Sequence, residues 1–295
     1  MHIKIGTRNS KLALWQAKDV EKKLKKNGNT VEIIEIISEG DKILDTPLPL
    51  IGGKGIFTKA LDDALIEKKI DIAVHSYKDI PVENHNLLQI SSVLKRENPI
   101  DVLLFKKKIN LSKEKATIGT SSNRRKAQWL NKYPHHTIVD IRGNVPTRIS
   151  KLKQSNLDGI ILAYAGVSRL DLLNEIGEEL HWMIPAPAQG AIAIMSLKEN
   201  IHLNNEINKI SNKESWLCAD AERSFLNHLD GGCSSPIGAY SYIENNKVFL
   251  KGVVLDKNGS KKIEVKLSQN INETIDIGKK AAELAIKKGV LSIIN

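Results

Sequence analysis

Arginine is scarce in this 295-residue chain, and its placement indicates an anion-binding site. The sequence has 36 lysines but only eight arginines. Six of the eight lie in short segments flanked by Gly, Ser or Thr: Arg8, Arg124, Arg125, Arg142, Arg148 and Arg169. A guanidinium group is a rigid planar fork that binds carboxylate or phosphate through two parallel hydrogen bonds and stays protonated. The set therefore predicts a dispersed site for a polyanion; the alternative is six ordinary surface charges.

A cysteine preceded by two glycines is the sharpest local feature. Gly231-Gly232-Cys233 follows a predicted helix, so the Cys233 sulfur lies on a loop whose glycines leave it accessible. A loop cysteine in a cysteine-poor chain is a candidate for covalent chemistry, and the alternative is a small residue buried at a turn. The second cysteine, Cys218, lies within a predicted helix and is predicted to belong to the core.

A carboxylate follows the predicted buried strand Asp71–Val74. Asp79 lies beyond the carboxyl end of that strand, where ligands of α/β sheets bind. It could pair with a cation or accept a hydrogen bond from a ring N–H; the alternative is an Asx turn before Pro81.

Two further loops have the composition of anion-binding segments. Gly119–Arg125 combines hydroxyls, backbone N–H groups at a helix start and two guanidiniums, which favours anion binding. Gly52-Gly53-Lys54-Gly55 lacks the spacing of a P-loop and is interpreted as a mobile loop or lid, with Lys54 and Lys59 adding positive charge.

The composition is that of a soluble globular protein with acidic partners. Hydrophobic residues make up 41% and charged residues 26%, and the formal net charge is +10. Nucleic acid is the weaker choice of partner because no Lys/Arg run exceeds three and aromatics are only 4%. No signal peptide, membrane span or disulfide framework is visible, so we expect a cytoplasmic protein. The histidines show no metal-ligand spacing, and His135-His136 is predicted to be solvated.

The first two thirds alternate strands and helices, which predicts parallel sheets with helices on both faces. The predicted strands are Ile3–Ile5, Val31–Ile37, Asp71–Val74, Thr117–Gly119, Thr137–Ile141 and Gly159–Ala163. The predicted helices run from Ser10 as N-cap to Lys26 before Gly28, and over Ile56–Lys69, Arg124–Tyr133 and Val145–Gln154. The last third predicts a small α+β domain with helices Lys213–Leu229 and Thr274–Lys288 around an antiparallel meander of Ile237–Tyr242, Val248–Leu255 and Lys261–Leu267.

Together these segments resemble one family nearly end to end: hydroxymethylbilane synthase, also called porphobilinogen deaminase. The matching segments begin with Thr7-Arg-Asn-Ser-Lys-Leu-Ala, Gly52-Gly-Lys-Gly-Ile-Phe-Thr-Lys and Asp71-Ile-Ala-Val-His-Ser-Tyr-Lys-Asp-Ile-Pro. They continue with Gly119-Thr-Ser-Ser-Asn-Arg-Arg, Ile141-Arg-Gly-Asn-Val-Pro-Thr-Arg and Ala165-Gly-Val-Ser-Arg-Leu. The last are Pro185-Ala-Pro-Ala-Gln-Gly and Glu222-Arg through Gly231-Gly-Cys.

The resemblance implies an α/β fold of three domains. Two would be binding-protein-like, with mixed, mainly parallel sheets, and a small α+β C-terminal domain would have a three-stranded antiparallel sheet. The expected boundaries are residues 1–94 with 191–210, residues 98–187, and residues 213–295.

The resemblance also implies the chemistry. Porphobilinogen molecules would be condensed, with loss of ammonia, onto a dipyrromethane cofactor that Cys233 holds through a thioether. Asp79 would be the catalytic carboxylate, and the protein would act as a monomer on porphobilinogen and the growing polypyrrole. The implied cofactor-binding residues are Lys78, Thr120, Ser122, Arg124, Arg125, Gly143 and Arg148, and the implied substrate-binding residues are Arg8, Ser10, Arg142, Arg169 and Gln189. No metal is implied.

Two positions depart from the family pattern, and two other functions compete with this interpretation. Ser235 stands where the family prefers a β-branched residue, and Asn123 replaces a usual Leu before Arg124. One alternative is a non-enzymatic, periplasmic-type binding protein for a small acidic ligand. Another is a nucleic-acid binder, whose affinity would fall steeply with salt. Neither alternative accounts for Asp79 and Cys233 together.

Overall fold

The described residues of the computed structural model form two compact units. The residues that the structure describes are 1–38, 58–82, 85–231, 235–273 and 276–294. The first unit takes residues 1–38, 58–82, 85–97 and 190–217, and the second takes the other described residues. Both the predicted loop Gly52–Gly55 and Cys233 lie outside the described residues.

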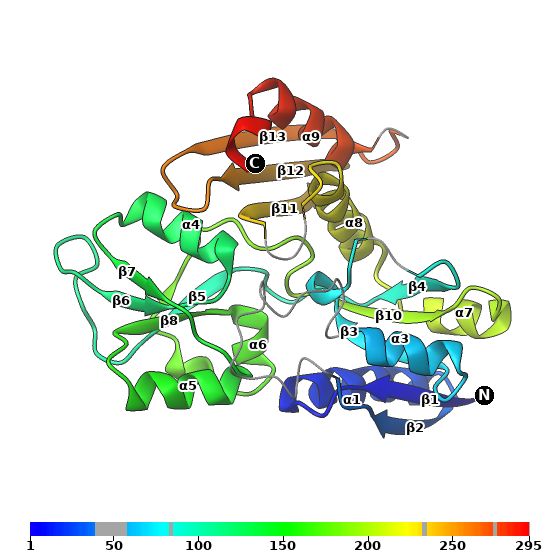
Figure 1. Ribbon diagram of the computed structural model, residues 1–295. Coiled ribbons are helices and arrows are strands. Elements are labelled where there is room, and N and C mark those ends of the chain that lie inside the picture. The colour runs from blue at the N-terminus through cyan, green and yellow to red at the C-terminus, as the bar shows by residue number, and fades with distance from the viewer. Residues whose placement is uncertain (39–57, 83–84, 232–234, 274–275, 295) are drawn as a thin grey trace. The chain divides into compact units, whose positions relative to one another are not determined.

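The first unit is a five-stranded mixed sheet with helices on both faces (Figure 1). Its strand order is β2-β1-β3-β10-β4, in which β1 pairs in parallel with β2 and β3, and β10 is antiparallel to β3 and β4. The strands are β1 (His2–Thr7), β2 (Thr30–Glu35), β3 (Ile72–Ser76), β4 (Leu88–Val93) and β10 (Ile192–Leu197). The helices are α1 (Lys11–Lys26), α3 (Lys59–Ile66), the 3-10 helix η2 (Tyr77–Asp79), α7 (Ile201–Asn208) and the first residues of α8 (Lys213–Asn227).

Local signals fix the helix nearest the N-terminus. The Ser10 side chain accepts a hydrogen bond from the Ala13 N–H at 3.2 Å, as an N-cap does. Gly28 follows the end of α1 with a φ of +83°, a conformation that glycine adopts without strain. Between these ends α1 buries Val20 and Leu24 against the β1 residue Ile5 and against α7. Figure 1 shows α1 lying along β1 and β2.

The second unit contains another five-stranded mixed sheet, with the order β7-β6-β8-β5-β9. β6 pairs in parallel with β7 and β8, and β5 is antiparallel to β8 and β9. The strands are β5 (Asp101–Phe105), β6 (Thr117–Gly119), β7 (Thr137–Val139), β8 (Gly159–Ala163) and β9 (Glu178–Glu179). The helices are α4 (Asn123–Lys132), α5 (Val145–Gln154), α6 (Tyr164–Ser168) and the 3-10 helix η3 (Leu173–Glu175).

Alternate residues of β5 pack into two separate hydrophobic cores, one on each face of this sheet. Val102 and Leu104 pack with α5 residue Leu152, whereas Leu103 packs on the opposite face with α4 residue Trp129. Both faces of this sheet are therefore covered by helices.

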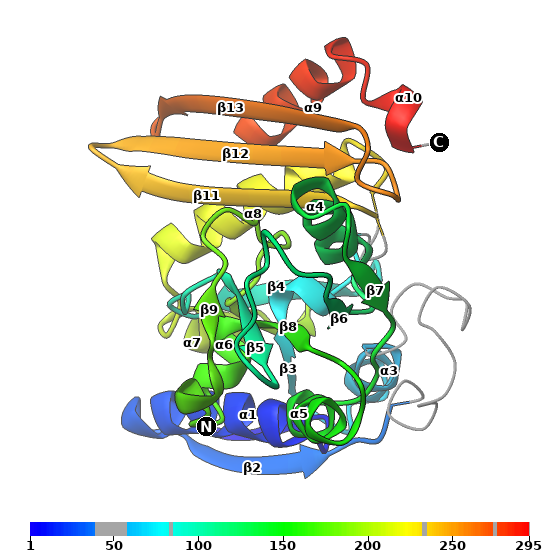
Figure 2. The same ribbon diagram turned by 90° about the vertical axis from the view of Figure 1, so that its left-hand side faces the viewer.

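A third sheet, also in the second unit, is antiparallel throughout. Its strands β11 (Ile237–Glu244), β12 (Lys247–Leu255) and β13 (Lys262–Asn270) follow one another in order (Figure 2). Asn245 and Asn246 both have positive φ, as a tight two-residue hairpin turn requires. The helices α9 (Ile277–Lys287) and α10 (Leu291–Ile294) complete this part, and Phe225 of α8 packs against Gly252.

The predicted α/β class, with two mixed sheets and a three-stranded antiparallel sheet, is confirmed. The predicted excess of parallel pairs is wrong, because each mixed sheet has two parallel and two antiparallel pairs. The antiparallel strands β4, β5, β9 and β10 were missing from the prediction. The division between units falls within α8, after Leu217, and the three predicted domain boundaries stay predictions.

Candidate functional site

In the first unit, a short turn presents Asp79 at the carboxyl end of β3. The strand is buried, and the chain then forms η2, in which Tyr77 is buried while Lys78 and Asp79 are half-buried. The Tyr77 N–H donates to the Ala191 carbonyl at 3.0 Å, just before β10. The carboxylate thus lies on a turn that two strands anchor, which is a suitable place for a reacting group.

Arg8 follows β1, the parallel neighbour of β3, so the two chain segments leave the same edge of the sheet. Arg8 is half-buried. The Ser10 hydroxyl accepts the capping bond of α1 and retains its own O–H as a donor. Within this unit, therefore, Arg8, Ser10, Lys78 and Asp79 belong to the segments following two adjacent parallel strands.

His75, the fourth residue of β3, is buried, and the positive charge of Arg8 disfavours its protonation. Burial and, to a smaller extent, the positive charge of Arg8 together lower the pKa of His75 to about 3. Among the described residues, its buried Nε2 atom has no hydrogen-bond partner. The imidazole is therefore neutral near neutral pH, and it adds no second positive charge beside Arg8.

This burial predicts a pH dependence of stability. The unfolded chain protonates His75 near pH 6.5 and the folded chain only near pH 3, so the unfolded state binds more protons between these values. The free energy of unfolding should therefore fall as pH drops through this window, by up to about 1.4 kcal/mol per pH unit from this group. Denaturant unfolding of wild type and His75→Gln across pH 3 to 7 measures it. Parallel curves for the two proteins would show that His75 is not buried in neutral form.

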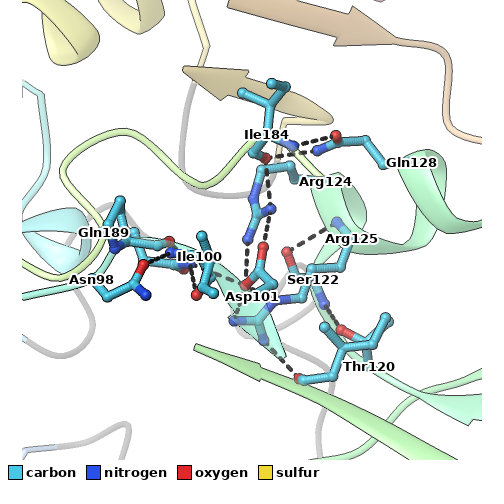
Figure 3. A network of polar contacts seen from close by, with 12 residues as sticks. Asn98, Ile100, Asp101, Thr120, Ser122, Arg124, Arg125, Gln128, Ile184 and Gln189 are labelled. Atoms are coloured by element: carbon cyan, nitrogen blue, oxygen red, sulfur yellow. Dashed lines mark hydrogen bonds and ion pairs between the residues drawn. The ribbon is translucent and has the colours of Figure 1, made fainter. Parts of the chain in front are cut away.

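In the second unit, Arg124 and Arg125 at the start of α4 converge on the carboxylate of Asp101, the first residue of β5 (Figure 3). Arg124 binds as a fork, with Nη1 2.6 Å from Oδ2 and Nη2 3.3 Å from Oδ1. Arg125 places Nε at 2.9 Å and Nη2 at 2.8 Å from Oδ1. All three side chains are buried.

Gln189 completes this cluster. Its Nε2 donates to Asp101 Oδ1 at 3.0 Å and to the Pro99 carbonyl at 2.7 Å. Burial alone would raise the pKa of Asp101, but Arg124, Arg125 and the amide of Gln189 outweigh it and hold that pKa far below its usual range. Asp101 is therefore a carboxylate at any physiological pH.

Thr120 and Ser122 shape the loop between β6 and α4. The Thr120 N–H donates to the Val139 carbonyl at 2.9 Å, and its Oγ1 accepts from the Ser122 N–H at 3.3 Å. Ser122 is the N-cap of α4 and accepts from the Arg125 N–H at 3.4 Å. These bonds orient the first turn of α4, and with it both arginines.

A second pair of arginines consists of Arg142, between β7 and α5, and Arg148, within α5. Arg148 donates from Nε to the Gly143 carbonyl at 2.7 Å, and Asn144 caps α5 by accepting from the Thr147 N–H. Gly143 has a φ of +112°, and a Cβ there would lie 2.6 Å from Cγ2 of Thr147, so only glycine fits. Burial lowers the pKa of Arg142, and Asp140 opposes that shift.

The remaining predicted residues have mixed outcomes. Arg169, just after α6, is buried. Cys218 is buried in α8, as predicted for a core residue. The prediction that His136 is solvated is wrong: it is buried and accepts at Nδ1 from Trp129 Nε1 at 3.1 Å, whereas His135 is exposed.

Two other kinds of feature do not occur within the described ranges. No group of three or more His, Cys, Asp or Glu side chains able to hold a metal ion occurs there. The same ranges contain no helix of the length and apolar character needed to cross a membrane.

Sequence reasoning did not identify Asp101 or Glu222 as functional candidates. The sequence contains one signal for Asp101: its carboxylate directly precedes the apolar run Val102–Phe105. Glu222 is buried in α8 and accepts from the Ala188 N–H at 2.7 Å and from the Ser241 N–H at 2.6 Å.

Two solved structures resemble part of the chain at low sequence identity. The second substrate binding domain of a putative amino acid ABC transporter from Streptococcus pneumoniae aligns with a TM-score of 0.45 and 12% identity, covering 71% of this chain and 91% of that one. The periplasmic VFT2 domain of Bordetella pertussis BvgS gives a TM-score of 0.44 and 13% identity, covering 71% and 86%. A likeness at this level carries no functional meaning.

Comparison with known sequences is far more specific. A curated porphobilinogen deaminase of Desulforamulus reducens is 40% identical over 99% of this chain and 96% of its own length. That of Oceanobacillus iheyensis is 42% identical with the same coverage, and that of Acetivibrio thermocellus is 44% identical over 88% of this chain and 89% of its own.

Two family models cover most of the chain in order. Residues 3–205 match "Porphobilinogen deaminase, dipyromethane cofactor binding domain" and residues 216–287 match "Porphobilinogen deaminase, C-terminal domain". The first match contains Asp79 and the six candidate arginines Arg8, Arg124, Arg125, Arg142, Arg148 and Arg169, as the resemblance of the motifs implies. The chain belongs to the porphobilinogen deaminase family.

Proposed function

We propose that this chain is a hydroxymethylbilane synthase, a transferase of tetrapyrrole biosynthesis. It joins four porphobilinogen molecules in sequence to a covalent dipyrromethane primer and then releases the linear tetrapyrrole by hydrolysis. In sum, four porphobilinogen and one water give one hydroxymethylbilane and four ammonia. The observation that carries the proposal is the ordered match of both family models over residues 3–205 and 216–287.

The donor set of the second unit fits a dipyrromethane. Two pyrrole rings with acetate and propionate side chains carry four carboxylates, and guanidinium groups are their best partners. Arg124 and Arg125 both form ion pairs with the Asp101 carboxylate, and these three side chains together carry one net positive charge. We propose that Cys233 holds the cofactor through a thioether. The proposed cofactor-binding residues of the second unit are Thr120, Ser122, Arg124, Arg125, Gly143 and Arg148, and Lys78 of the first unit is proposed in addition.

Asp79 is the proposed catalytic carboxylate. When bound, the dipyrromethane supplies the pyrrole carbon to which the first substrate ring is joined. The Asp79 carboxylate would accept hydrogen bonds from pyrrole N–H groups and stabilise the positive charge that develops on the substrate as ammonia leaves. It would also accept the proton that is lost on coupling. Half-burial strengthens these interactions relative to water.

Five further residues are the proposed substrate contacts. Carboxylates of incoming and growing rings would be bound by Arg8, Ser10, Arg142, Arg169 and Gln189. A formal net charge of +10 supports attraction of such an anionic substrate. A monomer in the cytoplasm, with no nucleic-acid or membrane partner, is proposed on the sparse aromatics and the two cysteines.

The binding-protein alternative differs in one measurable way. A binding protein returns its ligand unchanged, whereas the proposed enzyme consumes porphobilinogen and releases four ammonia for each tetrapyrrole. The purified chain is incubated with porphobilinogen, and ammonia and oxidised tetrapyrrole are quantified over time. A ratio near four supports the proposal; unchanged porphobilinogen contradicts it.

A further inference from the structure

We propose that Asp101 is a positioning residue for cofactor acquisition, which holds Arg124 and Arg125 as one rigid cationic unit. The inference rests on the proposed function, because the ligand of this unit is the anionic dipyrromethane. It concerns a residue for which the sequence motifs gave no role.

The geometry leaves the two arginines little freedom. Asp101 is 0% exposed. Its two oxygens accept hydrogen bonds from both Nη atoms of Arg124 and from Nε of Arg125, and Nη2 of Arg125 forms an ion pair with Oδ1 (Figure 3). Backbone carbonyls complete the anchoring, since Arg124 Nη1 lies 2.9 Å from the Ile184 oxygen and Arg125 Nη1 lies 2.9 Å from the Ile161 oxygen. One carboxylate therefore sets the orientation of both guanidinium groups.

The charge balance explains why a carboxylate is needed. Two adjacent guanidiniums in a buried site repel each other and lose their hydration, and an anion between them offsets both costs. Two positive charges and one negative charge leave the cluster at +1, which still favours an anionic ligand. Neutral Asn at position 101 would leave two buried like charges and would also direct an N–H₂ donor at other donors.

A second buried carboxylate fixes the amide that supports Asp101. Gln189 donates to Asp101, and its preceding residue Ala188 has a φ of +61°. The Ala188 N–H donates to Glu222 Oε2 at 2.7 Å, and the same carboxylate accepts from the Ser241 N–H of β11. These hydrogen bonds link α8 and β11 to the arginine cluster and hold the Gln189 amide beside Asp101.

The test separates positioning from general stability. Three variants are purified: Asp101→Asn, the double variant Asp101→Asn with Arg124→Gln, and Asp171→Asn as matched control. Asp171 is exposed with a φ of +58°, a conformation that Asn adopts readily. For each, intact-protein mass spectrometry of the folded, gel-filtered fraction gives the share of chains carrying two pyrrole rings, and denaturant unfolding gives stability.

The expected results differ between the two readouts. Asp101→Asn should lower both the unfolding midpoint and the share of two-ring chains, the latter at least about ten-fold. The double variant removes one positive charge as well, so its midpoint should return toward wild type while the two-ring share stays low. The control should match wild type in both.

Two outcomes would overturn the inference. One is wild-type cofactor content in Asp101→Asn, or in the double variant if the single variant does not fold. The other is a double variant that regains stability and cofactor content together, because Asp101 would then serve stability alone. Absence of any two-ring adduct in wild type would instead refute the proposed function, so the two failures are distinguishable.

Discussion

Replacing Cys233 by Ser is expected to give a folded chain with no covalent adduct and no measurable turnover. A serine hydroxyl ionises far less readily than a cysteine thiol and is a much weaker nucleophile, so the thioether cannot be replaced. Intact-protein mass spectrometry and the porphobilinogen assay measure the two effects.

Cys218→Ser is the matched control, because the chain has only these two cysteines. Cys218 is buried in α8, and the variant should keep both the adduct and turnover, with at most a modest loss of stability. An adduct that persists in Cys233→Ser, or one that disappears in Cys218→Ser, would move the attachment site to Cys218.

Replacing Asp79 by Asn should leave the adduct in place and lower kcat by about 10² to 10³-fold. The amide keeps the size of the side chain but loses the charge that would stabilise a cationic pyrrole. KM should change much less, because that interaction is strongest in the transition state.

Asp63→Asn on α3 is the control for loss of one negative charge, since Asp63 is exposed and belongs to the same unit. It should retain wild-type kcat. If Asp79→Asn kept about half of the wild-type kcat, a loss of only about 0.4 kcal/mol, the carboxylate would be a structural residue of the turn.

Local sequence signals predicted much of the secondary structure. The prediction matched β6, α5 and β8 residue for residue, and it placed the start and the end of α1 correctly. Capping and turn residues act within a few positions of themselves: Ser10 binds Ala13, and Asn144 binds Thr147. A short stretch of sequence around such residues is therefore enough to predict where a helix begins or ends.

Long-range pairing could not be predicted in this way. β10 pairs antiparallel with both β3 and β4, although about a hundred residues of chain separate it from them. An apolar run such as Ile192–Leu197 is compatible with a buried strand or a helical segment, and its partner strands decide between them. The same reason explains why the balance of parallel and antiparallel pairs was wrong.

The candidate site shows the same division. The motifs predict Asp79 and the arginines as candidates one by one. They give no indication that Arg124 and Arg125 share Asp101, which lies 23 and 24 positions earlier. The sequence predicts a solvated His136, whereas its burial depends on the contact with Trp129. Predicting these features needs the packing of distant elements in addition to the motifs.

The most direct test of the account is the intact mass of the wild-type chain before and during turnover. Before substrate is added, the chain should carry two pyrrole rings, and peptide mapping should place them on Cys233. After a small excess of porphobilinogen, a ladder should appear with one, two and three further rings on the same cysteine, which collapses to the two-ring form as tetrapyrrole is released. An unmodified chain that nevertheless turns over porphobilinogen would contradict covalent, stepwise elongation.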